Sequence, residues 1–302
     1  MKIATMTIYD NVMERAAKTS QAVNEAVNAV THGRKITRLS DDPFRLGQML
    51  ETRADISGID QYKRNIEMGQ VWLTTSEIGL RGVQDRLSDI RTTAIKLAND
   101  NHNEQDRKTG ANEIEDKILD IIEVANSDVN GRYIFGGIST DKPPFRLVDE
   151  YGEEVEVKQA KRVEYMGDKV PFQIKTNKSQ KLAVGNDGSA IFSDMFVSLL
   201  ELRDALKNNS VEGIQEQIDP VYEHTEHISA FNSGVGLKMN RLDFRDDILA
   251  DLKLSNQDKL SSLAEVDMTE AATTLRVKEV AYQAALMASQ RVLNMKGLMD
   301  YI

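Results

Sequence analysis

A long heptad pattern in the first third of the chain constrains the fold more than any other sequence feature. Starting at Ile59, alternating steps of three and four residues reach twelve positions, of which only Gly69 and Ser76 lack an apolar side chain. A continuous helix over this stretch would be about 58 Å long, at about 1.5 Å per residue. The pattern therefore predicts an elongated rod. The positions are Ile59, Tyr62, Ile66, Gly69, Leu73, Ser76, Leu80, Val83, Leu87, Ile90, Ala94 and Leu97.

The same stepping predicts two further helices, each with a narrow apolar seam. One lies in residues 12–30 and the other in residues 111–125. A seam this narrow indicates packing against one neighbouring helix. The seam positions are Val12, Ala16, Thr19, Val23, Ala26 and Val30 in the first helix, and Ala111, Ile114, Ile118, Ile121 and Ala125 in the second.

The longest helix has a readable start. Asp42 can accept hydrogen bonds from the free amides of a first helical turn. Pro43 then occupies the first helical position, where its missing N–H has no cost. Residues 33–40 are therefore predicted to form a loop.

The C-terminal segment is apolar on more than one helical face, so one neighbouring helix cannot cover it. Its expected partner within the chain is the helix of residues 12–30, which offers only a thin stripe. We therefore expect packing between copies, and we expect the terminal segments to be largely disordered in a free monomer. The predicted assembly residues are Val12, Val23, Val27, Val30, Leu275, Tyr282, Leu286, Leu293, Met295, Leu298 and Ile302.

The middle of the chain predicts a β insert followed by more helices. Aromatic and β-branched residues are dense between residues 132 and 192, where glycine-containing turns occur at 136–137, 151–152, 166–167 and 186–188. A helix over residues 192–208 would turn four side chains inward. Residues 211–231 read as a helix interrupted or kinked at Pro220, with a hinge or cap at 232–236. The last helix is expected to begin beside Asp267. The four inward side chains are Phe196, Leu199, Leu200 and Leu206.

Composition excludes several classes of function. The chain has no cysteine, which removes disulfides, thiolate zinc sites and cysteine nucleophiles. The net charge of −10 disfavours a general attraction to nucleic acid or anionic membrane. No stretch is apolar enough for a membrane span or a secretory signal. Phosphate-binding loops and nucleophile elbows are also missing, so we expect no catalytic residue, no cofactor and no metal.

Three patterns allow a chemical alternative but favour a structural one. His224 and His227 are three residues apart and could chelate a metal with a third ligand, although a solvated helix face explains them as well. Asp41 beside Asp42 could act as an acid–base pair, but the neighbouring proline favours helix capping. Trp72 is expected to pack between helices rather than to stack on a sugar or base.

Several motifs resemble those of flagellins and their related hook-associated proteins. The first is the signature loop of Gly33 followed by Ser40, Asp41, Asp42 and Pro43. Further matches lie at residues 61–66, 126–137, 143–145 and 234–242, so the resemblance spans essentially the whole chain. Residues 133–137 (YIFGG) and the ending 297–302 (GLMDYI) resemble the hook–filament junction member of the family better than a flagellin.

The resemblance implies a mainly α, elongated flagellin-like rod with paired terminal helices and a small outer β domain. The implied domains are 1–40 with 268–302 as the axial core, 41–130 with 190–267 as the helical rod, and 131–189 as the β-rich outer part. The implied role is structural. The protein would join the hook, through hook-associated protein 1, to the flagellin filament, and copies would assemble as a ring or short helical layer.

The family also implies export through the flagellar type III apparatus, from the cytoplasm to the extracellular junction. An export chaperone would cover the C-terminal helix beforehand, since that apolar surface would otherwise aggregate. Two alternatives remain open: a short flagellin, which would form the filament itself, and a coiled-coil scaffold outside the filament. A peripheral membrane role is disfavoured, because acidic and neutral residues dilute the basic ones on the last helix.

Overall fold

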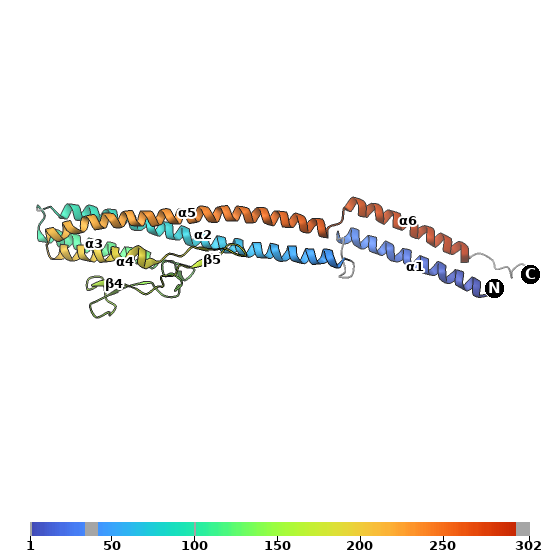
Figure 1. The fold of residues 1–302 in the computed structure, drawn as a ribbon, viewed down its shortest axis with the longest axis horizontal. Helices are drawn as coiled ribbons and strands as arrows, with labels where there is room; N and C mark the ends of the chain where they lie inside the picture. Colours follow the sequence, from blue (N-terminus) through green and yellow to red (C-terminus); the bar gives the residue numbers. More distant parts are fainter. Residues whose placement is uncertain (1, 34–41, 100, 294–302) are drawn as a thin grey trace, which may run out of the picture. The chain divides into compact units, whose positions relative to one another are not determined.

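The computed structural model describes residues 2–33, 42–99 and 101–293 (Figure 1). Six helices and three antiparallel strand pairs make up this part of the chain, which confirms a mainly α fold with a β insert. The helices are α1 (Lys2–His32), α2 (Pro43–Leu97), α3 (Glu104–Ala125), α4 (Gly188–Lys207), α5 (Val211–Ala264) and α6 (Met268–Leu293). The strands are β1 (Asp128–Val129), β2 (Arg132–Tyr133), β3 (Phe145–Val148), β4 (Arg162–Tyr165), β5 (Gln173–Lys175) and β6 (Lys181–Ala183).

The chain divides into two compact units, which are described separately. The terminal unit contains residues 1–58 and 252–302, and the central unit contains residues 59–251. Both long helices, α2 and α5, contribute to each unit. The finer division into three domains stays a prediction.

In the terminal unit, α1 and α6 lie side by side and antiparallel (Figure 1). Gly33 ends α1 with φ 63°, a left-handed conformation that favours glycine, and its N–H donates to the Ala29 carbonyl at 3.0 Å. The Gly33 carbonyl accepts from the Val266 N–H at 3.1 Å, just before α6 begins at Met268. The predicted start of the last helix is therefore confirmed.

The predicted start of α2 is also confirmed. The Asp42 Oδ1 accepts a hydrogen bond from the Arg45 N–H at 3.0 Å, and α2 begins at Pro43. Residues 34–40 of the predicted loop lie outside the described residues.

The heptad seam of α2 forms the axis of the central unit. Eleven of its twelve positions are buried, and the twelfth, Tyr62, is partly buried. Ser76 is tolerated because its hydroxyl donates to the Trp72 carbonyl at 2.9 Å. Gly69 leaves room for the strand region, since a Cβ there would lie 2.6 Å from Ile174 Cδ1 in strand β5. The two breaks in the apolar pattern thus have separate structural reasons.

Helix α5 runs antiparallel to α2 in the central unit (Figure 1). It is continuous through Pro220, so the predicted interruption there is wrong, while a kink at Pro220 stays a prediction. Residues 232–236, predicted as a hinge or cap, are helical as well. A proline removes one backbone hydrogen bond, but here a buried apolar residue at every seventh position holds the helix against its neighbours. The buried positions are Ile214, Val221, Ile228, Val235, Leu242 and Leu249.

The strands form three separate two-stranded antiparallel ladders, β1–β2, β3–β4 and β5–β6. Asn130 and Gly131 join β1 to β2 with positive φ values of 54° and 76°, as a tight two-residue hairpin requires. The predicted turn at residues 186–188 is instead a helix cap, because the Asp187 carboxylate accepts from the Ser189 N–H at 2.9 Å. Helix α4 follows, and its four predicted inward side chains are buried.

Candidate assembly surfaces

Helix α1 has one apolar face. Its seam residues from Val12 to Val30 turn toward α6 and are at least half-buried. Its opposite side is polar and exposed, and there Glu14 pairs with Lys18 at 2.7 Å and the Gln21 amide donates to Glu25 at 3.1 Å. Pairing with α6 therefore covers the seam of α1, while Met13 and Val27 beside the seam stay 49% and 39% exposed.

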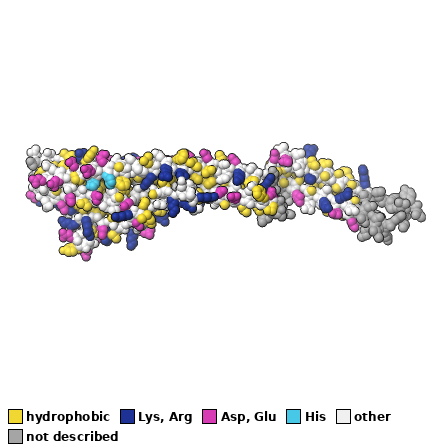
Figure 2. All heavy atoms as spheres, in the orientation of Figure 1, with side chains coloured by type: hydrophobic (Ala, Val, Ile, Leu, Met, Phe, Trp, Pro, Cys, Tyr) yellow, Lys and Arg dark blue, Asp and Glu magenta, His cyan; other side chains and the backbone are white. Residues whose placement is uncertain are grey.

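Helix α6 has two apolar faces. The face toward α1 includes Ala271 and Ser289, which are 7% and 8% exposed. Val277, Val280 and Met287 are 62%, 60% and 63% exposed, and with exposed Ala284 they follow steps of three, four and three residues. At about 3.6 residues per turn these four residues lie opposite Ala271 and Ser289. We call them the outer face of α6. Figure 2 shows hydrophobic side chains exposed over this helix pair.

The structure divides the predicted assembly residues into three groups. Val12, Val23, Val30, Leu275 and Tyr282 are half-buried residues of the terminal unit. Two residues, Val27 and Leu286, are 39% and 42% exposed. The remaining four lie at or beyond the end of the described side chains, and they are Leu293, Met295, Leu298 and Ile302.

The sequence did not lead us to predict the outer face of α6 as one surface. Its residues belong to the apolar C-terminal segment, but sequence reasoning did not separate those that meet α1 from those that do not. The sequence does contain a signal for this face, because Val277, Val280, Ala284 and Met287 follow a second pattern of three- and four-residue steps, offset from the pattern that faces α1. Of the signature loop, Gly33, Asp42 and Pro43 have the end-of-helix and start-of-helix roles described above, whereas Ser40 and Asp41 lie outside the described residues.

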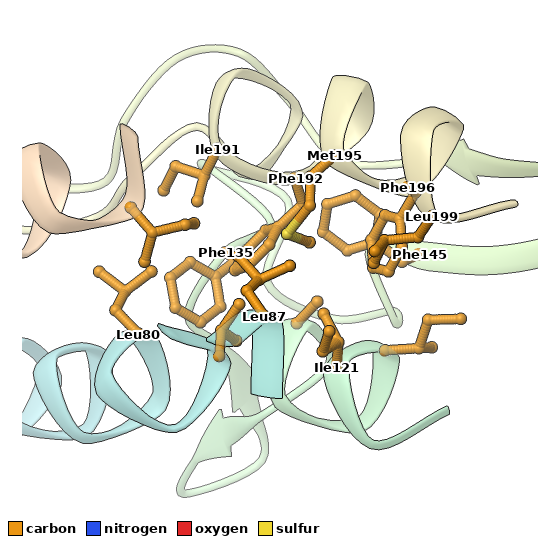
Figure 3. Close-up of a cluster of buried hydrophobic side chains, with 14 of the residues drawn as sticks. Leu80, Leu87, Ile121, Phe135, Phe145, Ile191, Phe192, Met195, Phe196 and Leu199 are labelled. Carbon is orange, nitrogen blue, oxygen red and sulfur yellow. The ribbon is translucent and has the colours of Figure 1, made fainter. Parts of the chain in front are cut away.

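Residues 133–137 anchor the strand region to the central helices. The Phe135 ring is fully buried and meets Phe192 edge-on, with ring centroids 5.0 Å apart (Figure 3). Gly137 has φ 64°, and a Cβ there would collide with the Asp168 carbonyl oxygen. The Phe135 carbonyl accepts from Tyr165 Oη at 3.1 Å, and burial raises the pKa of Tyr165 to about 12. This motif therefore has a packing role.

The two histidines and Trp72, for which a chemical role was an alternative, have packing and hydrogen-bonding roles in the structure. His224 Nε2 lies 3.0 Å from Ser198 Oγ, and the His227 ring packs edge-on against Phe231 with centroids 4.9 Å apart. Across the described residues, no three histidine, aspartate or glutamate side chains gather as a metal site would require. Trp72 is 1% exposed and stacks on Phe172 at 5.2 Å, so it packs as predicted, but against the strand region. No described helix is long and apolar enough to cross a membrane.

Comparison with known proteins agrees with this architecture. A sequence profile of the bacterial flagellin N-terminal helical region matches residues 3–140. Flagellar hook-associated protein 3 of Escherichia coli is 22% identical, with 99% of this chain and 98% of that protein covered. A putative flagellar hook-associated protein from Vibrio parahaemolyticus shares the fold, with a TM-score of 0.65, 19% identity, and coverage of 74% of this chain and 100% of that one. The flagellar junction protein of Legionella pneumophila gives a TM-score of 0.57 at 14% identity, with 74% and 100% covered.

The paired terminal helices, the long antiparallel helices and the strand insert form a flagellin-like fold. Within that class, the chain is similar to flagellar hook-associated protein 3 over essentially its whole length, as residues 133–137 and 297–302 had indicated. Its relatives are structural proteins of the bacterial flagellum.

Proposed function

We propose that this protein is a structural component of the flagellum that joins the hook to the flagellin filament. It would contact hook-associated protein 1 on one side and flagellin on the other, and copies would pack beside one another as a ring or short helical layer. Heterologous contacts between identical subunits close into a ring or continue as a helix, depending on the rotation between neighbours. The role is one of assembly, without catalysis or a cofactor.

The outer face of α6 is the observation that carries this proposal. A helix pair that were complete in itself would be polar on the side away from the seam, as α1 is at Glu14 and Lys18, whereas α6 exposes Val277, Val280 and Met287 there. Each buried valine or methionine side chain stabilises an assembly by about 1.5–3 kcal/mol. The outer face of α6 therefore favours packing against other subunits, together with the predicted residues Val27 and Leu286.

The same surface supports the proposed route to the junction. Before assembly an exposed apolar helix promotes aggregation. An export chaperone that covers α6 in the cytoplasm would prevent this until the type III apparatus delivers the chain to its extracellular position. The absence of cysteine in the sequence suits passage of an unfolded chain.

A gene-deletion strain tests the role. We expect electron microscopy to show bare hooks, with monomeric flagellin released into the medium. Intact filaments would instead support a scaffold outside the filament. Loss of flagellin from both cells and medium would identify the chain as the filament subunit.

A pair of matched variants tests the surface. Val277→Ser with Val280→Ser should fail to restore filaments in the deletion strain, because it removes the centre of the outer face of α6. The control is Val71→Ser with Ile78→Ser on α2, whose side chains are similarly exposed at 52% and 63%. Both proteins should be produced at wild-type levels. Restoration by both variants would contradict assembly through α6.

A further inference from the structure

The hairpin formed by β5 and β6 presents two like charges directly opposite each other. Lys175 pairs with Lys181 in the strand register, and both side chains are exposed. The alternate pair, Ile174 and Leu182, faces the helices, and Ile174 is 3% exposed. Like charges in this position destabilise a hairpin. Among the described residues neither lysine has a carboxylate within ion-pair distance, so the repulsion is unrelieved in the monomer.

Helix α5 adds a row of cations beside this hairpin. Lys238 Nζ donates to Asn186 Oδ1 at 3.0 Å, and the Arg245 guanidinium donates to the Gln180 side chain in the hairpin turn. Arg241, which is exposed, is placed between them along the helix. Figure 2 shows Lys and Arg side chains gathered along this part of the molecule. We define the basic surface as Lys175, Lys181, Lys238, Arg241 and Arg245.

The basic surface departs from the charge of the whole chain. Residues 157–181 contain seven Lys and Arg but only two Asp and Glu, in a protein whose net charge is −10. The compensating negative charge must lie elsewhere on the chain. A surface of this sign attracts an acidic partner, and another copy of the same chain carries one.

The hairpin backbone that carries Lys175 and Lys181 is held in a fixed position. The Asn65 amide donates to the Lys175 carbonyl at 2.8 Å, and Ile174 packs onto the bare backbone of Gly69. The Asn177 side chain accepts from the backbone of Gln180 at 2.7 Å and so closes the hairpin turn. A hairpin backbone fixed in this way loses little conformational freedom when a partner binds.

The first half of α5 presents the opposite charge in a straight line. Five exposed carboxylate residues follow steps of four, three, four and three, on the side of the helix opposite its buried residues. Across the part of the chain that the structure describes, none of the five has an ion-pair partner. We call them the acidic stripe. It consists of Glu212, Glu216, Asp219, Glu223 and Glu226.

We propose that the acidic stripe of one copy binds the basic surface of the next copy. This rests on the proposed function, in which copies assemble side by side, and specifies how the central units contact one another. The centres of the two surfaces are about 22 residues apart on α5, or about 33 Å at 1.5 Å per residue. Neighbouring copies are therefore staggered along the helix. The contact is heterologous, so it can repeat from copy to copy.

Cysteine cross-linking in assembled flagella tests the contact directly. The chain has no cysteine of its own, so a variant with Lys181→Cys and Asp219→Cys contains only the two introduced thiols. After oxidation we expect a ladder of disulfide-linked chains longer than dimers. The control, Lys142→Cys with Asp219→Cys, should give none. If flagella assemble but the test variant gives no cross-link, or gives only dimers, the staggered contact is wrong.

Charge reversal tests its electrostatic basis. Lys175→Glu with Lys181→Glu, and separately Glu216→Lys with Glu223→Lys, should each lower the number of filaments per cell at least about tenfold, because like charges then face each other. Combining all four substitutions should restore filaments. The control, Lys142→Glu with Lys169→Glu, makes the same change in net charge at two other exposed lysines and should have no effect.

The outcomes separate this inference from the proposed function. If only the lysine reversals impair assembly, the basic surface binds another anionic partner and the contact between copies is wrong. If none of the reversals has an effect, the contact is also wrong, while the junction role remains. If the wild-type gene itself does not restore filaments to the deletion strain, the proposed function fails first.

Discussion

The central unit and the α1–α6 pair use the same heptad pattern with different results. In the central unit Leu73, Leu80 and Leu87 are completely buried, because other helices and the strand region cover the seam of α2. In the terminal unit the seam between α1 and α6 is mostly half-buried, and α6 leaves Val277 and Val280 in solvent. The same spacing of apolar residues thus gives either a fully buried core or a partly exposed one, depending on how many elements pack against the helix.

The difference has an energetic meaning. The free energy from apolar burial scales with the area removed from water, at about 25 cal/mol per Å². The central unit gains this free energy within one chain. The outer face of α6 gains it only when a partner covers that face, so binding of a partner raises the stability of the terminal pair by mass action.

Hydrogen exchange on the monomer should show the largest difference between the two regions. We expect amides of α2 at residues 66–90 to exchange only through global unfolding, and amides of α6 at residues 270–290 to exchange through local opening. The free energies of these processes should differ by about 5 kcal/mol or more, which is over about a thousandfold in rate. Equal protection of both helices in a monomer would remove the distinction.

A cavity in the core of the central unit should have the next largest effect, on the free energy of unfolding of that unit. Phe192 is fully buried and contacts the rings of Phe135 and Phe145 (Figure 3). Phe192→Ala should lower the free energy of unfolding by about 3–5 kcal/mol. Urea titration followed by fluorescence of Trp72, the only tryptophan, reports on this unit alone. The matched variant Val280→Ala on α6 should change the free energy of unfolding of the central unit by less than about 0.5 kcal/mol.

Replacing a buried cation should cause the next largest loss of stability. Arg203 is 1% exposed and donates to the carbonyls of Val157 and Ala160 at 2.7 Å and 2.9 Å, which fastens the loop before β4 to α4. Arg203→Met should cost about 2–3 kcal/mol, because two buried carbonyls lose charged donors. Exposed Arg162 provides the control, and Arg162→Met should have little effect in the same urea titration. Similar losses for both variants would mean that surface charge, rather than the buried contacts, is responsible.

Local periodicity was sufficient to predict most of the fold. The seam of α2, the capping by Asp42 at the start of α2 and the boundary at Asp267 all depend on residues close in sequence, and the structure confirms them. Pro220 misled because the local cost of a proline is outweighed by packing of Val221 and its heptad neighbours on distant elements. The seventh-residue spacing of Ile214, Val221 and Ile228 is visible in the sequence on both sides of Pro220, but the elements that cover these residues are not.

The candidate surfaces were harder to predict for the same reason. The sequence showed that α6 has excess apolar residues, but only the position of α1 separates Leu275, which faces the seam, from Val277, which does not. The basic surface combines a hairpin and a helix that are more than fifty residues apart in sequence. Its strand register, which places Lys175 opposite Lys181, could not be determined from turn residues alone.

Two glycines in the central unit should respond in opposite directions to the same substitution. Gly69→Ala places a Cβ 2.6 Å from Ile174 Cδ1, with Leu242 and Val184 preventing an easy shift, so we expect a loss of about 1–3 kcal/mol. Gly236→Ala meets nothing within 4 Å on α5 and should gain about 0.5–1 kcal/mol from better helix propensity. Urea titration monitored by Trp72 measures both, and a gain from Gly69→Ala would show that the hairpin is not tightly packed.

The smallest effect concerns pH and again separates a buried group from an exposed one. Burial lowers the pKa of His224, an effect that the nearby Asp194 carboxylate opposes and His227 reinforces. Since the folded state binds the proton less readily than the unfolded chain, the associated stability is complete above about pH 6.5 and falls as the pH decreases below that value. Between about pH 7.5 and about pH 5.5 the wild type should therefore lose more stability than His224→Gln, which keeps a polar group near Ser198. Equal losses would mean that carboxylates or exposed histidines govern the acid response, and the partly buried imidazole would then have no part in it.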